Sequence, residues 1–171
     1  MRVVLTPDGK QRLQHRLALV RAEFEAVVAD NPAALESGDT SGWHDNFAFE
    51  ENQRRMHQLA HRVRELERVL DRAEIVPPLR HTPERVIVGA AIRWRFVDDP
   101  PELVRAMWIS GYEDGDPAAG RVSYSSPLGH ALIGAAEGEE REATINGRKR
   151  RIEVLSLGPT PDEEGATCAA G

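Results

Sequence analysis

Acidic side chains are concentrated in one stretch of this chain. Residues 22–53 contain neither Lys nor Arg but hold eight carboxylates, on Glu23, Glu25, Asp30, Glu36, Asp39, Asp45, Glu50 and Glu51. Carboxylate oxygens suit hard divalent cations, which assist phosphodiester hydrolysis by stabilising the attacking and the leaving oxygen. The stretch therefore points to metal-assisted chemistry, provided that the fold gathers these carboxylates at one place.

Two helices are expected to flank the acidic stretch. Thr6, Pro7 and Asp8 form a helix-start pattern, so a helix should begin near residue 7. Apolar residues then recur at steps of four and three, the spacing of a coiled-coil seam, at Leu13, Leu17, Val20, Phe24 and Val27. A second seam, in a helix expected over residues 46–74, consists of Met56, Leu59, Val63, Leu66 and Leu70. The two seams predict an antiparallel hairpin over residues 1–76.

The turn of this hairpin should lie at residues 37–42, where glycines and short polar side chains favour loop geometry. Pro32 precedes the turn and indicates either a kink in the first helix or the start of a new helical turn. The turn would carry Asp39, with Asp45 close behind it, to the end of the hairpin.

A second domain is expected after a proline-rich linker at residues 77–83. Strands are predicted from β-branched and aromatic residues at 85–97, 102–111 and 122–125, and a short helix at 127–133. Asn146-Gly147 predicts a tight hairpin turn between strands at 140–145 and 148–157. The fold class is therefore α+β, a helical hairpin followed by a small antiparallel β domain at 84–158, with residues 159–171 expected to be disordered.

Charge and cysteine content exclude several classes of protein. A formal net charge of -6 argues against a general nucleic-acid binder, although local basic patches stay possible. A single cysteine, Cys168, cannot build a disulfide framework or a thiolate metal site. Because no apolar run approaches the length of a membrane span and the N-terminus has no apolar signal core, we expect a cytoplasmic protein without membrane contact.

Several short motifs, taken in order, resemble the Gre family of bacterial transcription elongation factors. The most specific is the segment SPLGHALIG at residues 126–134, which has His130 where the family usually has Arg. The others are residues 5–9 at the start, Gly38-Asp39 and Asp45-Asn46 at the turn, and residues 73–76 before the linker. Together the motifs cover about residues 5 to 157.

The resemblance implies a coiled coil followed by a domain like FK506-binding proteins. In this family the C-terminal domain docks on core RNA polymerase at the rim of the secondary channel, which here indicates Ser126, Pro127, Leu128 and Gly129 as polymerase-binding residues. The coiled coil enters the channel, where carboxylates at its tip help to hold the second catalytic Mg²⁺. The polymerase then hydrolyses the 3′ end of a backtracked RNA. The chain itself would be a monomer, would bind no metal when free and would not be an enzyme alone.

The acidic tip departs from the family pattern GDxxEN. Here Asp39 and Asp45 are six positions apart, and Gly42 falls where the pattern expects an acid, whichever motif is used as the anchor. A longer loop can still bring both carboxylates to one Mg²⁺, or it can misplace them. We therefore predict Asp39 and Asp45 as catalytic, metal-holding residues, with an inhibitor that occupies the channel without cleavage as the alternative function.

Three further residues are candidates for contact with RNA. Trp43 could stack on a base or fold back on the hairpin, and neighbouring His44 could assist proton transfer or be a solvated loop residue. Arg54 and Arg55 could guide RNA phosphates, or could form helical salt bridges such as Glu50 to Arg54 and Glu51 to Arg55.

Individual features of the sequence also fit other structures and functions. The SPLG segment could be simply a turn into a core helix. His57 and His61 lie one helical turn apart but have no convincing third zinc ligand. A stand-alone prolyl isomerase rests on fold resemblance alone, and a coiled-coil adaptor for another partner is a further alternative.

Overall fold

The computed structural model describes residues 3–36 and 45–161, and its description of side chains leaves out residues 30–48. The chain forms two compact units, Gln11–Arg72 and the combination of Met1–Lys10 with Ala73–Gly171. This division differs from the predicted domain limits, because the segments at both ends of the hairpin group with the β domain. Within the described residues, no helix is both long and apolar enough to cross a membrane.

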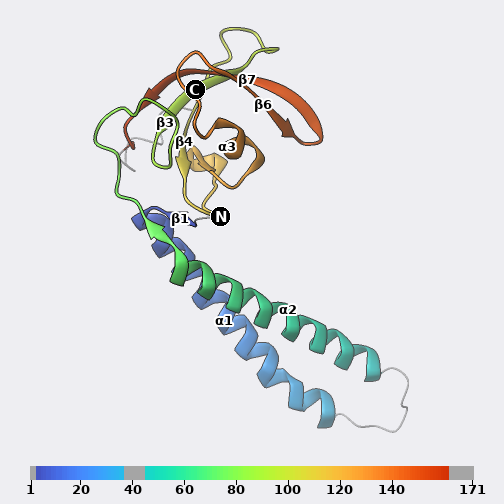
Figure 1. Cartoon of the computed structure of the whole chain (residues 1–171). Coiled ribbons are helices and arrows are strands. Elements are labelled where there is room, and N and C mark those ends of the chain that lie inside the picture. The colour runs from blue at the N-terminus through green and yellow to red at the C-terminus, as the bar shows by residue number, and fades with distance from the viewer. Residues whose placement is uncertain (1–2, 37–44, 162–171) are drawn as a thin grey trace. The chain divides into compact units, whose positions relative to one another are not determined.

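The helical hairpin consists of α1, Pro7–Glu36, and α2, Asp45–Arg72 (Figure 1). The predicted start of α1 is confirmed, and Thr6 acts as its cap because the Thr6 hydroxyl accepts a 3.0 Å bond from the Gly9 amide. α1 is continuous through Pro32, so no separate helix begins there. The predicted turn at residues 37–42 lies outside the described residues.

Both predicted seams lie along the inside of the hairpin. Leu13, Leu17 and Val27 of α1 are buried, and Leu66 of α2 is fully buried at 0% exposure. The other seam residues with described side chains are half-buried: Val20, Phe24, Met56, Leu59, Val63 and Leu70. Val69 is also buried, although it lies outside the predicted seam. The two helices are therefore held together mainly by an apolar stripe.

The second unit is built on a five-stranded sheet in the order β5-β4-β3-β7-β6. Its strands are β3 Ala91–Phe96, β4 Arg105–Ser110, β5 Arg121–Ser123, β6 Glu140–Ile145 and β7 Arg148–Gly158. A small parallel pair, β1 Val4–Leu5 and β2 Glu74–Ile75, lies in the same unit, and the Val4 carbonyl accepts a 2.9 Å bond from the Tyr112 amide.

The predicted antiparallel sheet is in fact mixed, because β5 runs parallel to β4. Parallel neighbours need a crossover connection, and here the chain between Ser110 and Arg121 provides it with a 3-10 turn, Pro117–Ala119. The first predicted strand, 85–97, also begins too early. Val86 instead bonds to residues that follow the short helix, and Gly89 has a φ of 95°, which no regular strand adopts.

The C-terminal segment is ordered further than predicted. Thr160 donates from its hydroxyl to the Gly89 carbonyl at 2.7 Å and accepts a 2.8 Å bond from the Leu79 amide. These two bonds fix Thr160 to Leu79 of the predicted linker and to Gly89 before β3, which explains why the expected disorder after residue 158 does not begin there. Residues 162–171 lie outside the described part of the chain.

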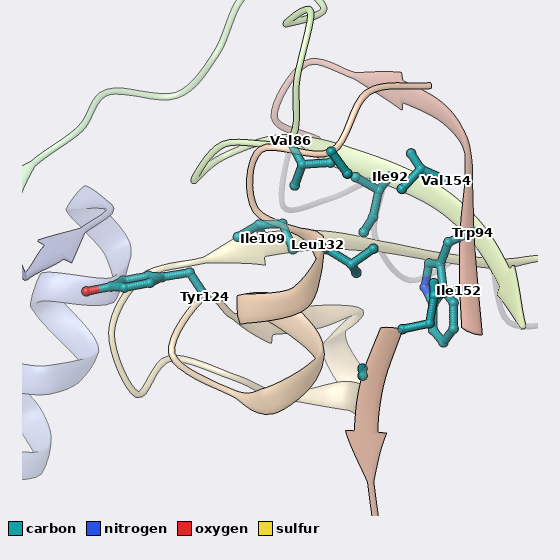
Figure 2. Packing of buried hydrophobic residues seen from close by; sticks show 10 residues of the cluster. Val86, Ile92, Trp94, Ile109, Tyr124, Leu132, Ile152 and Val154 are labelled. Carbon is teal, nitrogen blue, oxygen red and sulfur yellow. The ribbon is translucent and has the colours of Figure 1, made fainter. Parts of the chain in front are cut away.

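The core of this unit lies between the sheet and the short helix α3, Pro127–Leu132. Figure 2 shows Ile92, Trp94 and Ile152 from the sheet with Leu132 of α3. Tyr124, at the margin of this cluster, accepts a 3.1 Å bond from the Val4 amide on its hydroxyl. The core therefore fixes α3 and the segment before it, which contain the predicted docking motif.

Candidate functional site

The acidic residues at the turn of the hairpin are only partly within the described structure. Asp39, Trp43 and His44 lie outside the described residues, and Asp45 is the first residue of α2, with its side chain outside the description. The backbone nevertheless places α1 and α2 side by side in opposite directions (Figure 1). Asp39 belongs to the segment that connects Glu36 of α1 to Asp45 of α2 in the sequence.

Two ion pairs join the helices near the middle of α1. The Arg55 guanidinium lies 2.7 Å from the Glu23 carboxylate, and Arg21 pairs with Glu67 further along. Arg54 pairs within α2, at 3.7 Å from Glu50 and 3.5 Å from Glu51. The predicted Glu50–Arg54 pair is thus confirmed, whereas the predicted Glu51–Arg55 pair is wrong, because Arg55 faces α1.

These arginines are held weakly. The Arg54 and Arg55 side chains are 63% and 58% exposed, and exposed ion pairs contribute only about 0–1 kcal/mol. A phosphate could therefore replace their carboxylate partners at small cost. Their role as RNA-contacting residues stays a prediction.

The SPLG segment is a helix cap with a tightly packed glycine. The Ser126 hydroxyl accepts a 3.1 Å bond from the Gly129 amide and donates a 2.7 Å bond to the Ser123 carbonyl. A Cβ atom added at Gly129 would come closer than 3.0 Å to that same carbonyl. Local structure thus explains Ser126 and Gly129, while Pro127 is exposed and available to a partner.

Ser123 is a residue that the sequence did not single out. It is buried, its hydroxyl donates a 2.7 Å bond to the Gly111 carbonyl, and its own carbonyl receives Ser126. It therefore positions the SPLG segment on the sheet. A small residue at the end of a predicted strand is a weak signal, and only the tertiary structure reveals this role.

A charged cluster that sequence reasoning also missed lies at the end of β3. The Asp99 carboxylate accepts a 2.8 Å bond from Arg105 and a 2.6 Å bond from Arg150. These two hydrogen bonds, from Arg105 first and then Arg150, lower the pKa of Asp99 below its ordinary value. The guanidiniums also lie over the Phe96 ring, at 4.9 Å for Arg105 and 3.9 Å for Arg150. The cluster closes this end of the core.

The described side chains contain no group of three His, Cys, Asp or Glu residues that could hold a metal ion. A cavity of about 280 Å³ lies against β3, β4 and β7, and among its lining residues are Ala91, Trp108 and Arg93. Its lining is mostly apolar, so it offers no pair of groups for acid-base work.

Two family descriptions match almost the whole chain in sequence. "Transcription elongation factor, N-terminal" matches residues 3–75, and "Transcription elongation factor, GreA/GreB, C-term" matches residues 81–159. The chain belongs to the GreA/GreB family of transcription elongation factors. This confirms the resemblance that the motifs indicated.

Individual relatives of this Gre-family chain agree with the assignment. It is 31% identical to transcription elongation factor GreA of Sphingopyxis alaskensis over 84% of this chain and 87% of the relative. It is also 31% identical to GreA of Rhodospirillum rubrum, over 91% of this chain and 97% of that protein.

Among solved structures, the chain is similar to Gfh1 (GreA factor homolog 1) of Thermus thermophilus, to which it is 20% identical. The match covers 92% of this chain and 99% of that chain, with a TM-score of 0.42. At this TM-score the likeness is loose, and membership in the Gre family rests on the sequence matches.

Proposed function

We propose that this Gre-family factor binds RNA polymerase, inserts its α1–α2 hairpin into the secondary channel and stimulates cleavage of backtracked RNA. The observation that carries the proposal is the match of both halves of the chain to the family, over residues 3–75 and 81–159. The hairpin adds support, because residues 22–53, which include the segment between its two helices, hold eight carboxylates and no basic side chain. The factor would act as a monomer.

Asp39 and Asp45 are the residues that would hold Mg²⁺ in the polymerase active site. Carboxylate oxygens fit this cation by their chemistry, since Mg²⁺ is usually bound through one or two carboxylates together with phosphate and water. When bound, Mg²⁺ stabilises negative charge on the reacting oxygens of a phosphodiester. The two carboxylates would retain the ion, and Asp45 would do so from the first turn of α2.

The hairpin would guide the RNA and the β domain would dock. Arg54 and Arg55 can exchange their exposed carboxylate partners for phosphates of the RNA 3′ end, and Trp43 would stack on a base. Docking on the polymerase would use the SPLG segment, with Pro127 at the contact and Ser126 and Gly129 holding its shape.

The test is a cleavage assay on a stalled, backtracked elongation complex of bacterial core RNA polymerase. The wild-type chain should release short 3′ RNA fragments. Asp39→Ala with Asp45→Ala should abolish release while binding to core polymerase is kept. A matched control, Glu25→Ala with Asp71→Ala, removes two exposed carboxylates elsewhere on the hairpin and should cleave normally.

Full cleavage by the Asp39→Ala, Asp45→Ala variant would exclude these residues from the site. Binding of the wild-type chain without fragment release, together with competition against an active cleavage factor, would instead identify a channel-occupying inhibitor. Failure to bind core polymerase would overturn the proposal.

A further inference from the structure

The hairpin of β6 and β7 carries a concentration of positive charge in an otherwise acidic chain. β7 pairs with β3 as far as Ile152, and the Arg151 carbonyl accepts one more bond, of 3.0 Å, from the Val97 amide. From the pair Glu142↔Arg151 outward, the three pairs from Ala143↔Arg150 to Ile145↔Arg148 therefore form a ribbon of two strands, with no third strand among the described residues (Figure 1). We call residues 142–151 the basic ribbon. It contains four basic side chains, at positions 148 to 151, and a single acidic one, Glu142, although the whole chain has a net charge of -6.

The shape of the basic ribbon is fixed at both ends. Asn146 and Gly147 have φ values of 51° and 77°, as the turn of a tight two-residue hairpin requires. At the other end Arg150 lies over the Phe96 ring and bonds to Asp99, and Arg151 pairs with Glu140 at 3.4 Å. Arg150 and Arg151 are therefore engaged in holding the ribbon on the domain.

The other two basic side chains are free to meet a partner. Arg148 and Lys149 are exposed, and neither forms an ion pair or hydrogen bond within the part of the chain that the structure describes. Because neighbouring residues of a strand point to opposite faces, the two charges lie on opposite sides of the ribbon. Among the described residues of their unit no acidic side chain pairs with either of them, and Asp99 is shared between Arg105 and Arg150.

We propose that the basic ribbon binds the phosphate backbone of double-stranded DNA, through Arg148 and Lys149, without sequence preference. A two-stranded ribbon fits the major groove, which is about 12 Å wide, so charges on its two sides can reach phosphates on opposite walls. The inference goes beyond the proposed function, since it concerns the β domain and needs no polymerase.

Duplex DNA suits this surface better than the alternatives. It carries one negative charge per about 1.7 Å of axis, a density that few acidic protein surfaces match. Single-stranded RNA is bound mainly by aromatic side chains that stack on bases. The ribbon sequence contains no aromatic residue, and the nearby Phe96 ring is covered by Arg105 and Arg150.

The test is fluorescence anisotropy of a labelled 20-base-pair duplex titrated with the full chain at several salt concentrations between about 50 and 200 mM. We expect weak binding of the wild type that falls steeply with salt. Arg148→Gln with Lys149→Gln should weaken binding at the lowest salt about tenfold or more and reduce the log-log salt slope by about two, one for each lost phosphate contact. Circular dichroism should show that the variant is folded.

The matched control is Arg80→Gln with Arg93→Gln, which removes two exposed positive charges from the same unit. Its net charge therefore equals that of the Arg148→Gln, Lys149→Gln variant. It should keep the wild-type slope. Equal losses in the two variants would mean that net charge alone matters and would overturn the proposal. So would tighter binding of single-stranded RNA or of polyglutamate than of the duplex. Because the assay contains no polymerase, its failure leaves the cleavage proposal untouched.

Discussion

At Gly129 the chain allows no side chain, and the reason lies outside the motif in which this glycine occurs. The atom that a Cβ would strike is the Ser123 carbonyl, which already receives the Ser126 hydroxyl. One carbonyl thus sets the identity of Gly129 and orients the cap of α3. Ser126 and Gly129 are therefore needed for the fold. A variant of either residue that no longer docks on the polymerase must also be tested for stability.

Gly129→Ala is expected to lower the free energy of unfolding by about 1–3 kcal/mol or more, because the added methyl group forces the strand end and α3 apart. Denaturant unfolding followed by circular dichroism measures the change. His130→Ala, an exposed change on the same helix, is the control and should stay within about 0.5 kcal/mol of wild type. Equal stability of Gly129→Ala would show that the close contact relaxes freely.

Asp99 should make the stability of the β domain depend on pH in the acidic range. Its pKa is lowered in the folded state from 3.8, chiefly by Arg105 and then by Arg150, so the folded state favours the carboxylate. The stabilisation is therefore present above about pH 4 and is lost as the pH falls through the lowered value. Asp99→Asn should be less stable than wild type at pH 7, and the difference should shrink below the ordinary pKa. A difference that is constant with pH would contradict the assignment.

Residue types alone could indicate the cap at Ser126. They could not indicate the close contact at Gly129 or the charged cluster at Asp99. The cap is local, since an N-cap serine followed by proline can be recognised within four positions. The Asp99 cluster joins Arg105 and Arg150, the latter 51 positions away, and it exists only because β3 lies between β4 and β7. Without the order of the strands in the sheet, no sequence pattern brings these three residues together.

Among the elements, the helices were predictable and several strand limits were not. Each seam repeats over about 15 residues, so its period is unambiguous and the presence of two helices follows from it, whereas the continuity of α1 through Pro32 does not. Val86 has strand-like neighbours in the sequence but bonds to residues that follow α3, and only at Gly89 and Ala90 does this segment begin to bond to β4, through Ile109. The parallel β5 was missed because a ten-residue connection does not reveal the direction of the next strand.

The hairpin should depend on its apolar seam far more than on its ion pairs. Leu66 is fully buried, so Leu66→Ala should cost about 2–5 kcal/mol of unfolding free energy. Arg55→Gln breaks an ion pair whose partners are 58% and 46% exposed, and it should cost about 1 kcal/mol or less. Thermal unfolding of the two variants, followed by helical circular dichroism, compares them directly. A larger loss for Arg55→Gln would show that charge pairing holds the hairpin.

For the molecule as a whole, binding and chemistry are proposed to lie in different compact units. The SPLG segment belongs to the unit formed by Met1–Lys10 and Ala73–Gly171, whereas Asp45 belongs to Gln11–Arg72. The family could be recognised from motifs in both units, but the geometry of the tip could not be predicted, because Asp39 and Asp45 are spaced unlike the family pattern.

If docking is independent of the tip, Asp39→Ala with Asp45→Ala should act as an inhibitor of the wild-type factor. The variant keeps the docking unit and should compete for the same polymerase, so equal amounts of both, at saturation, should reduce the cleavage rate to about half by mass action. The measurement is the initial rate of fragment release as the variant is titrated at fixed wild type. The Glu25→Ala, Asp71→Ala variant, added in the same way, should leave the rate unchanged, because it both binds the polymerase and stimulates cleavage. A tip variant that fails to inhibit would show that the acidic turn itself supplies binding energy, and chemistry and docking would then share one surface.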